Sequence, residues 1–327
     1  MLTIGNLAFS SPLILAPMAG ISDLPFRILN RAFGCELAFV EMLNVRSVSY
    51  KSRKTKVMLA TDKKDRPLGV QILGSEERFI LKALDVLRGY QFDILDFNAA
   101  CPVKKVVRRG EGAALLKDPR KLAELVKLVK SAGKWPLTVK IRSGWDKDSV
   151  NVRDVALCCE DAGANGIFVH GRTKDQGYSG AVDYQAIARA KKAVKVPVIA
   201  SGDILSGPLA KKMLDETGSD GILIARGSLG NPWIFREISE YLGSGAAVNR
   251  PPREEIVRTM LQHLQMCVDF YGERSGVVIF RKFFGWYTRG FRKVRPLREK
   301  SSRARTHEEM VRVIEQCREN AFQKVPS

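Results

Sequence analysis

Eight short apolar segments recur along the first 225 residues of this 327-residue chain, and helical patterns separate most of them. Most of the segments are continuous apolar runs rather than alternating ones. Continuous runs are expected for parallel strands that are covered on both faces. The segments lie at residues 13–16, 37–40, 69–73, 92–97, 137–141, 166–170, 196–200 and 221–225.

The intervening helices are predicted at residues 76–88, 119–132, 150–162 and 208–216, and the last three begin at the capping residues Asp118, Ser149 and Ser206. Eight β/α units over about 230 residues match the count and length of a (β/α)8 TIM barrel. A doubly wound sheet is the alternative, but no G-x-G-x-x-G follows the first strand. We therefore predict an α/β fold of the TIM-barrel type.

The pattern changes after about residue 233, where strand-like runs largely stop and a linker rich in Gly and Pro follows. The remaining chain predicts helices at residues 253–271, 276–289 and 306–322. We expect two domains, a barrel over residues 1–243 and an all-helical domain over residues 244–327.

The charge balance indicates a polyanionic partner, because 54 Lys and Arg against 35 Asp and Glu give a formal charge of +19. Between residues 281 and 305 there are ten Lys or Arg and one acidic residue, with aromatic residues interleaved. Basic residues beside rings are typical of nucleic-acid binding. A basic surface that serves solubility is the alternative, and the rings taken alone are better explained as core.

Other functional classes have little support in the sequence. No apolar run approaches the ~18–20 residues that span a bilayer, and the N-terminus has no basic n-region, so we expect a cytoplasmic protein without a membrane segment. The six cysteines form no C-x-x-C, and no His and Cys residues have metal-ligand spacing. We expect neither disulfides nor a bound metal.

In a TIM barrel, catalytic residues lie at the C-terminal ends of the strands. Polar residues or small-residue turns follow most of the predicted strands here. Each has a structural alternative: packing for Cys101, an ion pair for Lys140, a buried amide for Gln71 and a structural role for His170. Their coincidence on one rim favours a shared site, made of Ala16, Pro17, Met18, Gln71, Asn98, Cys101, Lys140, Arg142, His170, Arg172, Ser201, Gly202, Asp203, Ala225, Arg226 and Gly227.

The turns after the last two predicted strands indicate which class of ligand the site binds. Both contain glycine and lead into a helix, as in the barrel phosphate site where backbone N–H groups face an anion. Arg226 would add a charge-assisted contact. A phosphate there, with Lys140 and Gln71 facing a ring edge and a floor of small residues, suits flavin mononucleotide (FMN).

The chain also resembles a known family over nearly its whole length. Residues 95–102 read L-D-F-N-A-A-C-P and precede a basic loop and a Gly-Ala pair, and Ala-Pro-Met and His-Gly-Arg-Thr runs occur elsewhere. These motifs resemble those of the tRNA-dihydrouridine synthases, and residues 281–287 resemble the bacterial B-type branch. Three positions depart from the family pattern, namely Ala100, Ser201 and Ala225.

The resemblance implies reduction of the uracil C5=C6 bond in tRNA, with FMN as cofactor and NADPH as reductant. Hydride would pass from flavin N5 to C6 and a proton would reach C5. A thiol suits the second role, because a pKa near ~8.5 leaves it protonated at neutral pH yet able to donate, and we assign it to Cys101.

The remaining predicted residues receive binding roles. Lys140 would lie near flavin N1 and O2, and His170 would support the flavin. Asn98 would bind the uracil edge, while Arg142 and Arg172 would bind a base carbonyl or a phosphate. We expect tRNA as the partner of a monomeric enzyme. Two other classes stay open: a flavin enzyme that reduces a free pyrimidine or enone, and an RNA-binding paralogue without catalysis.

Overall fold

The computed structural model describes residues 1–246, 248 and 250–319, and it confirms the TIM barrel. Eight parallel strands pair in a ring, which the pairing of β4 with β6 closes. A further two-residue strand, β5 (Leu43–Asn44), lies beside β6. The ring consists of β3 (Leu13–Leu15), β4 (Leu37–Phe39), β6 (Leu68–Leu73), β7 (Ile94–Asn98), β8 (Leu137–Arg142), β9 (Gly166–His170), β10 (Val198–Ser201) and β11 (Gly221–Ile224).

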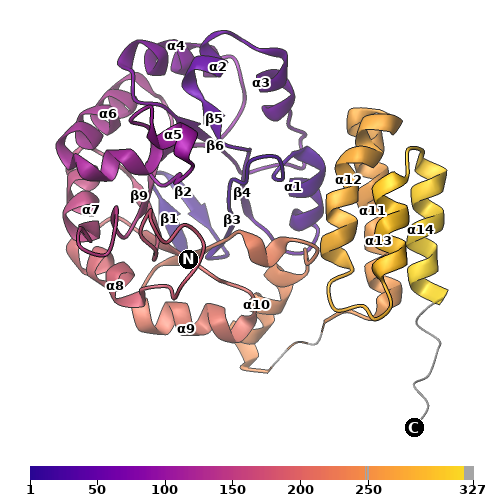
Figure 1. The fold of residues 1–327 in the computed structure, drawn as a ribbon. Helices are drawn as coiled ribbons and strands as arrows, with labels where there is room; N and C mark the ends of the chain where they lie inside the picture. Colours follow the sequence, from indigo (N-terminus) through magenta and orange to yellow (C-terminus); the bar gives the residue numbers. More distant parts are fainter. Residues whose placement is uncertain (247, 249, 320–327) are drawn as a thin grey trace.

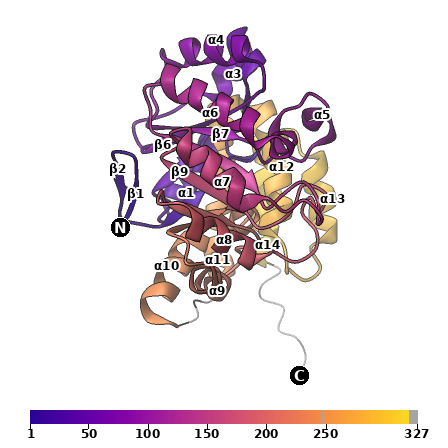
Figure 2. The same cartoon turned by 90° about the vertical axis from the view of Figure 1, so that its left-hand side faces the viewer.

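The barrel interior is a packed apolar core, and a hairpin that the sequence did not predict closes its N-terminal end. The hairpin pairs β1 (Leu2–Ile4) with β2 (Leu7–Phe9) and buries residues of both strands in the interior cluster. Deeper in the barrel, the rings of Phe39 and Phe168 meet edge to face at 5.6 Å. Figure 2 shows the hairpin at one end of the barrel and α5 (Lys104–Val107) at the other, which leaves the α5 end open for a site.

Helices surround the barrel (Figure 1), and capping residues explain where several begin. Asp118 accepts from the N–H of Lys121, so α6 covers the predicted residues. Ser206 caps α9 as predicted. Ser149 was wrongly predicted as a cap, because it bonds to Asp146 and α7 begins at Val152. The ring consists of α1 (Leu24–Arg31), α4 (Glu77–Leu87), α6 (Pro119–Ala132), α7 (Val152–Asp161), α8 (Tyr184–Ala193), α9 (Gly207–Thr217) and α10 (Ile234–Ser244).

Short helices in the loops add to this ring. The connection between β4 and β6 carries α2 (Val45–Ser49) and α3 (Arg53–Met58). The connection after β7 carries α5 and the 3-10 helix η1 (Gly112–Lys117), and a second 3-10 helix, η2 (Arg226–Ser228), follows β11. Sequence periodicity did not reveal these elements, because each is too short to repeat a 3.6-residue pattern.

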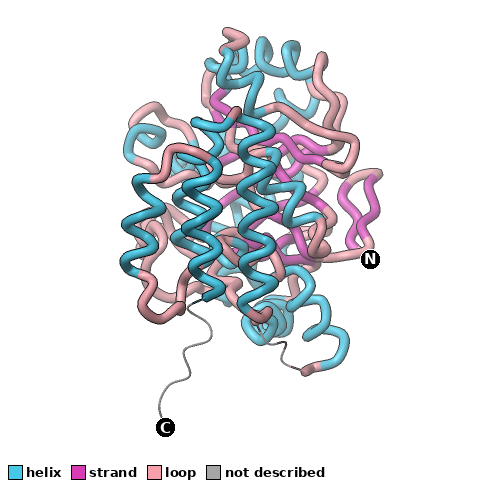
Figure 3. The backbone as a smooth tube through the Cα atoms, turned by 90° about the vertical axis from the view of Figure 1, so that its right-hand side faces the viewer, coloured by secondary structure: helices cyan, strands magenta, loops and turns pink. Residues whose placement is uncertain are grey.

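The C-terminal region is helical, as predicted, and packs on the side of the barrel beside α1 (Figures 1 and 3). It contains an additional helix, and the predicted residues 320–322 lie outside the described part of the chain. Phe26 of α1 stacks on Phe283 at 5.6 Å, and Tyr271 donates to Asp23 at 2.9 Å. The helices are α11 (Arg253–Tyr271), α12 (Glu273–Tyr287), α13 (Arg295–Arg303) and α14 (His307–Glu319).

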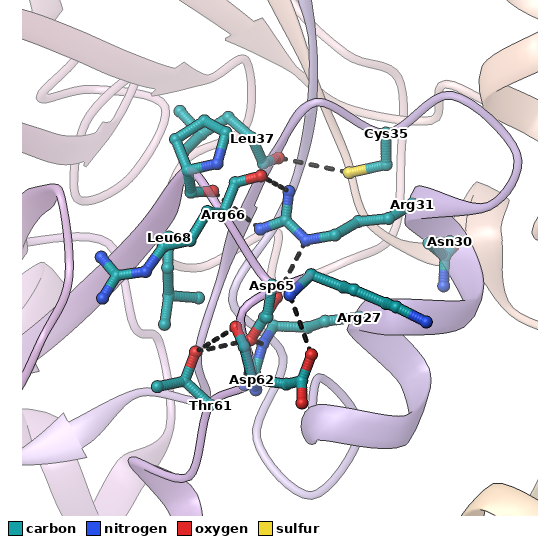
Figure 4. A network of polar contacts seen from close by, with 12 residues as sticks. Arg27, Asn30, Arg31, Cys35, Leu37, Thr61, Asp62, Asp65, Arg66 and Leu68 are labelled. Atoms are coloured by element: carbon teal, nitrogen blue, oxygen red, sulfur yellow. Dashed lines mark hydrogen bonds and ion pairs between the residues drawn. The ribbon is translucent and has the colours of Figure 1, made fainter.

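A buried ionic network fixes α1 to the loop before β6 (Figure 4). Asp65 is fully buried and accepts from Arg27 Nε at 2.9 Å and Arg27 Nη2 at 2.6 Å. Its second oxygen accepts from Arg31 Nε at 2.9 Å. One carboxylate therefore compensates two guanidinium groups of the same helix.

Candidate functional site

A cavity of about 490 Å³ opens at the C-terminal end of the barrel. Every residue that the sequence predicted for the site lines this cavity except Arg172. The strand ends therefore converge, because parallel strands of a closed barrel all point their carboxyl ends to the same mouth.

The loop after β7 presents Cys101 to the cavity. The thiol is half-buried, and the N–H of Cys101 donates to Asn98 Oδ1 at 2.9 Å. The backbone carbonyl of Cys101 accepts a hydrogen bond from the N–H of Ala113 at 3.1 Å. Gly112 has φ +60°, and a Cβ there would lie 2.8 Å from the Cys101 carbonyl oxygen, so only glycine lets the returning loop approach this closely. Burial raises the pKa of the Cys101 thiol, which keeps it protonated at neutral pH.

Ala100, one of the three departures from the pattern of the resembled family, fits without backbone strain. Its φ angle is not positive, so the backbone has a conformation that a residue with a Cβ atom adopts without strain. Its N–H donates to Asn98 Oδ1 at 3.0 Å and its carbonyl accepts from Arg142 Nε at 2.7 Å. The loop therefore does not need glycine at this position.

The side chains of Asn98 and Arg142 shape this loop as well as lining the cavity. Asn98 Oδ1 accepts two backbone N–H groups, and Nδ2 donates to Gln71 Oε1 at 2.8 Å. Arg142 also donates from Nη1 to the carbonyls of Thr173 at 2.9 Å and Gly177 at 2.8 Å. Most of their polar atoms thus already have protein partners, which favours a positioning role beside any contact with substrate.

A buried carboxylate that the sequence prediction missed lies behind Gln71. Asp96 of β7 has no exposed surface and accepts from Gln71 Nε2 at 2.6 Å and Thr138 Oγ1 at 2.7 Å. Burial raises its pKa, and the nearby charge of Lys140 opposes that shift. An Asp in the middle of an apolar strand was the sequence signal that could have identified it.

Lys140 and His170 both line the cavity, Lys140 with an ammonium group and His170 with a neutral imidazole. Lys140 has no ion pair or hydrogen bond from its ammonium group within the described ranges, and burial lowers its pKa while Asp96 raises it. Burial, together with Lys140 and three nearby arginines, lowers the pKa of His170 to about 2. His170 is therefore a neutral imidazole near the free ammonium.

The turns after β10 and β11 form an anion cradle. No acceptor among the described residues takes the backbone N–H groups of Gly202, Asp203, Arg226 or Gly227. A Cβ at Gly227 would lie 2.1 Å from the Ile204 carbonyl oxygen, so this turn requires glycine. Unused N–H groups of this kind bind phosphate oxygens.

Arg172, which the sequence predicted to bind substrate, does not line the cavity. It is 2% exposed and donates from Nη2 to the Gly180 carbonyl at 2.6 Å. It also pairs with the carboxylate of Asp203, whose other oxygen pairs with Arg226. Asp203 has φ +49°, and the two arginines hold it in this conformation. Arg172 therefore braces Asp203 of the cradle, and its contact with substrate stays a prediction.

Tyr178 at the mouth also escaped prediction. It lines the cavity with 59% of its surface exposed, and the guanidinium groups of Arg142 and Arg226 lie 5.5 and 5.6 Å from its ring centre. The ring belongs to a loop eight residues beyond the end of β9, where strand-end reasoning does not reach.

Within the described ranges, no group of three or more His, Cys, Asp or Glu residues could hold a metal ion. None of the described helices is long and apolar enough to cross a membrane.

Comparison with known proteins now identifies the family. The family model described as "Dihydrouridine synthase (Dus)" matches residues 14–325. The chain belongs to the dihydrouridine synthase family. This match covers both the barrel and the C-terminal helices.

Curated dihydrouridine synthases of bacteria are similar over most of the chain. The chain is 42% identical to tRNA-dihydrouridine synthase B of Pseudomonas aeruginosa over 284 residues, which are 87% of this chain and 86% of that protein. It is 40% identical to a probable tRNA-dihydrouridine synthase of Rickettsia conorii over 291 residues, 89% of this chain and 88% of that protein. These relatives confirm the predicted resemblance to the B-type branch.

Solved structures outside the dihydrouridine synthases share the fold. Histamine dehydrogenase from Rhizobium sp. 4-9 aligns with a TM-score of 0.58 at 13% identity, over 81% of this chain and 50% of that one. A 6-hydroxypseudooxynicotine amine oxidase from Pseudomonas geniculata aligns with a TM-score of 0.59 at 16% identity, over 74% of this chain and 49% of that one. At these identities the likeness concerns the fold alone.

Proposed function

We propose that this dihydrouridine synthase reduces the C5=C6 bond of uridines in tRNA, with FMN as cofactor and NADPH as reductant. One observation carries the proposal: a protonated, half-buried thiol, Cys101, shares one cavity with a free ammonium group and an anion cradle. The names of the relatives, which are tRNA-dihydrouridine synthases, support tRNA as the substrate.

The residues of the cavity fit FMN. The cradle of Gly202, Asp203, Arg226 and Gly227 offers unused N–H groups for a phosphate. The volume of about 490 Å³ lies in the range of pockets that bury ligands of this size. Residues at the other strand ends, with small apolar side chains or hydrogen-bonding groups, would hold the ring: Ala16, Pro17, Met18, Gln71, Lys140, His170, Ser201 and Ala225.

FMN bound in this cavity would supply the hydride that uracil C6 accepts. The chain's own residues must then supply the proton and hold the base. Cys101 donates its Sγ proton to C5, because its raised pKa keeps the proton available at neutral pH. Lys140 would hold the edge of the flavin ring, where its positive charge would stabilise a reduced, anionic flavin. Asn98 and Arg142 hold the thiol-bearing loop and border the space for the base.

The decisive experiment uses the purified enzyme with unmodified tRNA. A flavin absorbance spectrum, its bleaching by NADPH and the return of the oxidised spectrum on addition of tRNA are expected together, with dihydrouridine then mapped in the tRNA. Re-oxidation of the reduced flavin by free uridine but not by tRNA would indicate a small-molecule reductase instead. A protein without flavin would indicate an RNA-binding paralogue.

We further propose a division of labour in which residues 1–243 bind FMN and residues 244–327 bind tRNA. The structure sorts the basic and aromatic cluster into two groups. Phe280, Phe283, Phe284 and Tyr287 are core residues with 0–1% exposure, so they do not stack on bases. The side chains of Arg289, Arg292 and Lys293 are exposed, and none of them forms an ion pair within the described part of the chain.

Replacing Arg289, Arg292 and Lys293 together by Gln should weaken tRNA binding without loss of flavin. If each contacts a phosphate, the slope of log K against log salt should fall by about 0.7–0.9 for each residue removed. Filter binding across a salt series measures this slope. The matched control variant replaces Arg189 on α8 and Lys211 and Lys212 on α9 by Gln. These replacements should leave the slope unchanged. Equal slopes for the first variant and the wild type would assign those three residues to solubility.

A further inference from the structure

A chain of buried hydrogen bonds runs from the barrel wall to the backbone of the Cys101 loop. Thr138 Oγ1 donates to Asp96 Oδ1 at 2.7 Å, and Gln71 Nε2 donates to Asp96 Oδ2 at 2.6 Å. Asn98 Nδ2 donates to Gln71 Oε1 at 2.8 Å, and Asn98 Oδ1 accepts the N–H of Cys101 at 2.9 Å. The four side chains are at most 5% exposed, so water does not compete for these bonds.

Strand register brings these four side chains together. Gln71 on β6 lies opposite Asp96 on β7, and Asp96 lies opposite Thr138 on β8. Asn98 is two residues beyond Asp96, so its side chain leaves the same face of the strand. The chain of bonds therefore belongs to the rigid part of the barrel and reaches the loop only at its last link.

Asp96 acts at a distance from the chemistry, because it does not line the cavity. In the structure both Asp96 oxygens accept a hydrogen bond, one from Thr138 and one from Gln71, so neither oxygen acts as a donor. Gln71 must therefore turn its NH2 group to Asp96, which leaves its oxygen for the NH2 group of Asn98. Asn98 is then left with its oxygen toward the loop, where two N–H groups need an acceptor.

The shapes of the two amide groups do not decide this orientation, since the oxygen and nitrogen ends of an amide are nearly the same size. Hydrogen-bond donors and acceptors alone decide it. Asp96 at one end of the chain of bonds and the two loop N–H groups at the other therefore favour the same orientation of Gln71 and Asn98.

We propose that Asp96 is a positioning residue whose two acceptor oxygens set the hydrogen-bond direction from Gln71 through Asn98 and so hold the Cys101 loop in place. The inference deepens the proposed function, on which it rests for the meaning of that loop position. Asp96 also faces the charge of Lys140 on β8, so a second role as its counter-charge must be separated by experiment.

A neutral amide at position 96 weakens this preference, because it has one acceptor end and one donor end. In Asp96→Asn the new amide can keep its oxygen toward Gln71, which preserves the native order, or it can donate to Gln71 Oε1, after which Gln71 offers its NH2 group to Asn98. In the second arrangement the NH2 group of Asn98 faces the N–H groups of the loop, and donors face donors. We expect the variant to populate this second arrangement, in which the loop shifts and the exposure of the thiol changes.

The test compares Asp96→Asn with Thr138→Val in the flavin-loaded, full-length enzyme. Thr138→Val removes one hydrogen bond from the same buried carboxylate but keeps its charge, so a merely structural role predicts similar damage in both variants. The first measurement is the rate at which iodoacetamide alkylates Cys101, resolved by peptide mass spectrometry, with the half-buried Cys158 of α7 as internal reference.

We expect Asp96→Asn to raise the Cys101 alkylation rate relative to Cys158 by about threefold or more, since a released loop opens more often. Oxidation of the NADPH-reduced enzyme by tRNA should slow by about 10–100-fold, as expected when a reacting group is displaced by about 1 Å. Thr138→Val should stay within about fivefold of the wild type in tRNA oxidation, because one neutral hydrogen bond is lost.

An equal alkylation rate of Cys101 in Asp96→Asn and in the wild type would overturn the proposal. If only the rate of flavin reduction by NADPH changes, Asp96 acts as the counter-charge of Lys140 instead. If Asp96→Asn does not fold, Asn98→Ala removes the last link without touching the charge, and an unchanged alkylation rate there also overturns it. Alkylation needs neither tRNA nor NADPH. If the wild-type enzyme does not modify tRNA but Cys101 is still alkylated faster in Asp96→Asn than in Thr138→Val, the proposed function is refuted and this inference stands.

Discussion

Cys101→Ala should keep its bound flavin and accept electrons from NADPH, yet reduce uridine in tRNA about 10²–10⁴-fold more slowly, the usual contribution of a general acid. The reason is the position of the thiol in the cavity, where burial keeps it protonated. Alanine leaves the backbone bonds of the loop to Asn98 and Ala113 in place. Stopped-flow absorbance separates the two half-reactions.

Cys158→Ala is the matched control, because Cys158 is also half-buried but lies on the outer helix α7. It should match the wild type in both half-reactions. Wild-type rates of tRNA-dependent oxidation in Cys101→Ala would show that another group donates the proton to C5. Slowing of both half-reactions in that variant would instead assign Cys101 to the flavin environment.

Asp65→Ala should lower the free energy of unfolding by about 3–5 kcal/mol, the usual cost of leaving a buried charge without its partner. Asp65 and Arg27 have no exposed side-chain surface, and Arg31 has 9%. Removing the carboxylate leaves both guanidinium groups of α1 uncompensated in the interior. Equilibrium urea denaturation, followed by tryptophan fluorescence, measures the change.

Asp215→Ala is the control for this comparison, because it breaks the pair with Lys211 in which the side chains are 58% and 52% exposed. Exposed pairs four residues apart on a helix contribute about 0.3–0.5 kcal/mol, so its denaturation midpoint should barely move. If Asp65→Ala yields no folded protein, Asp65→Asn tests the same charge with less loss of hydrogen bonding. Equal midpoints for Asp65→Asn and Asp215→Ala would show that the buried network does not stabilise the barrel.

Much of the fold was predictable because it depends on local patterns. The buried strands appear as continuous apolar runs, and capping residues such as Asp118 and Ser206 placed the starts of helices correctly. The hairpin over the barrel floor and the short helices α2, α3 and α5 escaped, since segments of three to six residues show no periodicity.

Much of the site was predictable for a similar reason. A closed parallel barrel brings all strand ends to one mouth, so residues such as Cys101, Lys140 and Gly227 could be grouped before their distances were known. Tyr178 was missed because it lies well beyond a strand end and reaches the mouth only through the path of its loop.

The amino-acid sequence alone determined the barrel, the C-terminal helices, the converging strand ends and the thiol among them, because these follow from residue order along single segments. The tertiary structure decided how the side chains are used. Strand register placed Asp96 behind Gln71, and the path of the loop after β9 lets Arg172 bond to the Gly180 carbonyl and pair with Asp203. Such contacts join residues far apart in the chain, so they depend on how segments pack and no local pattern encodes them.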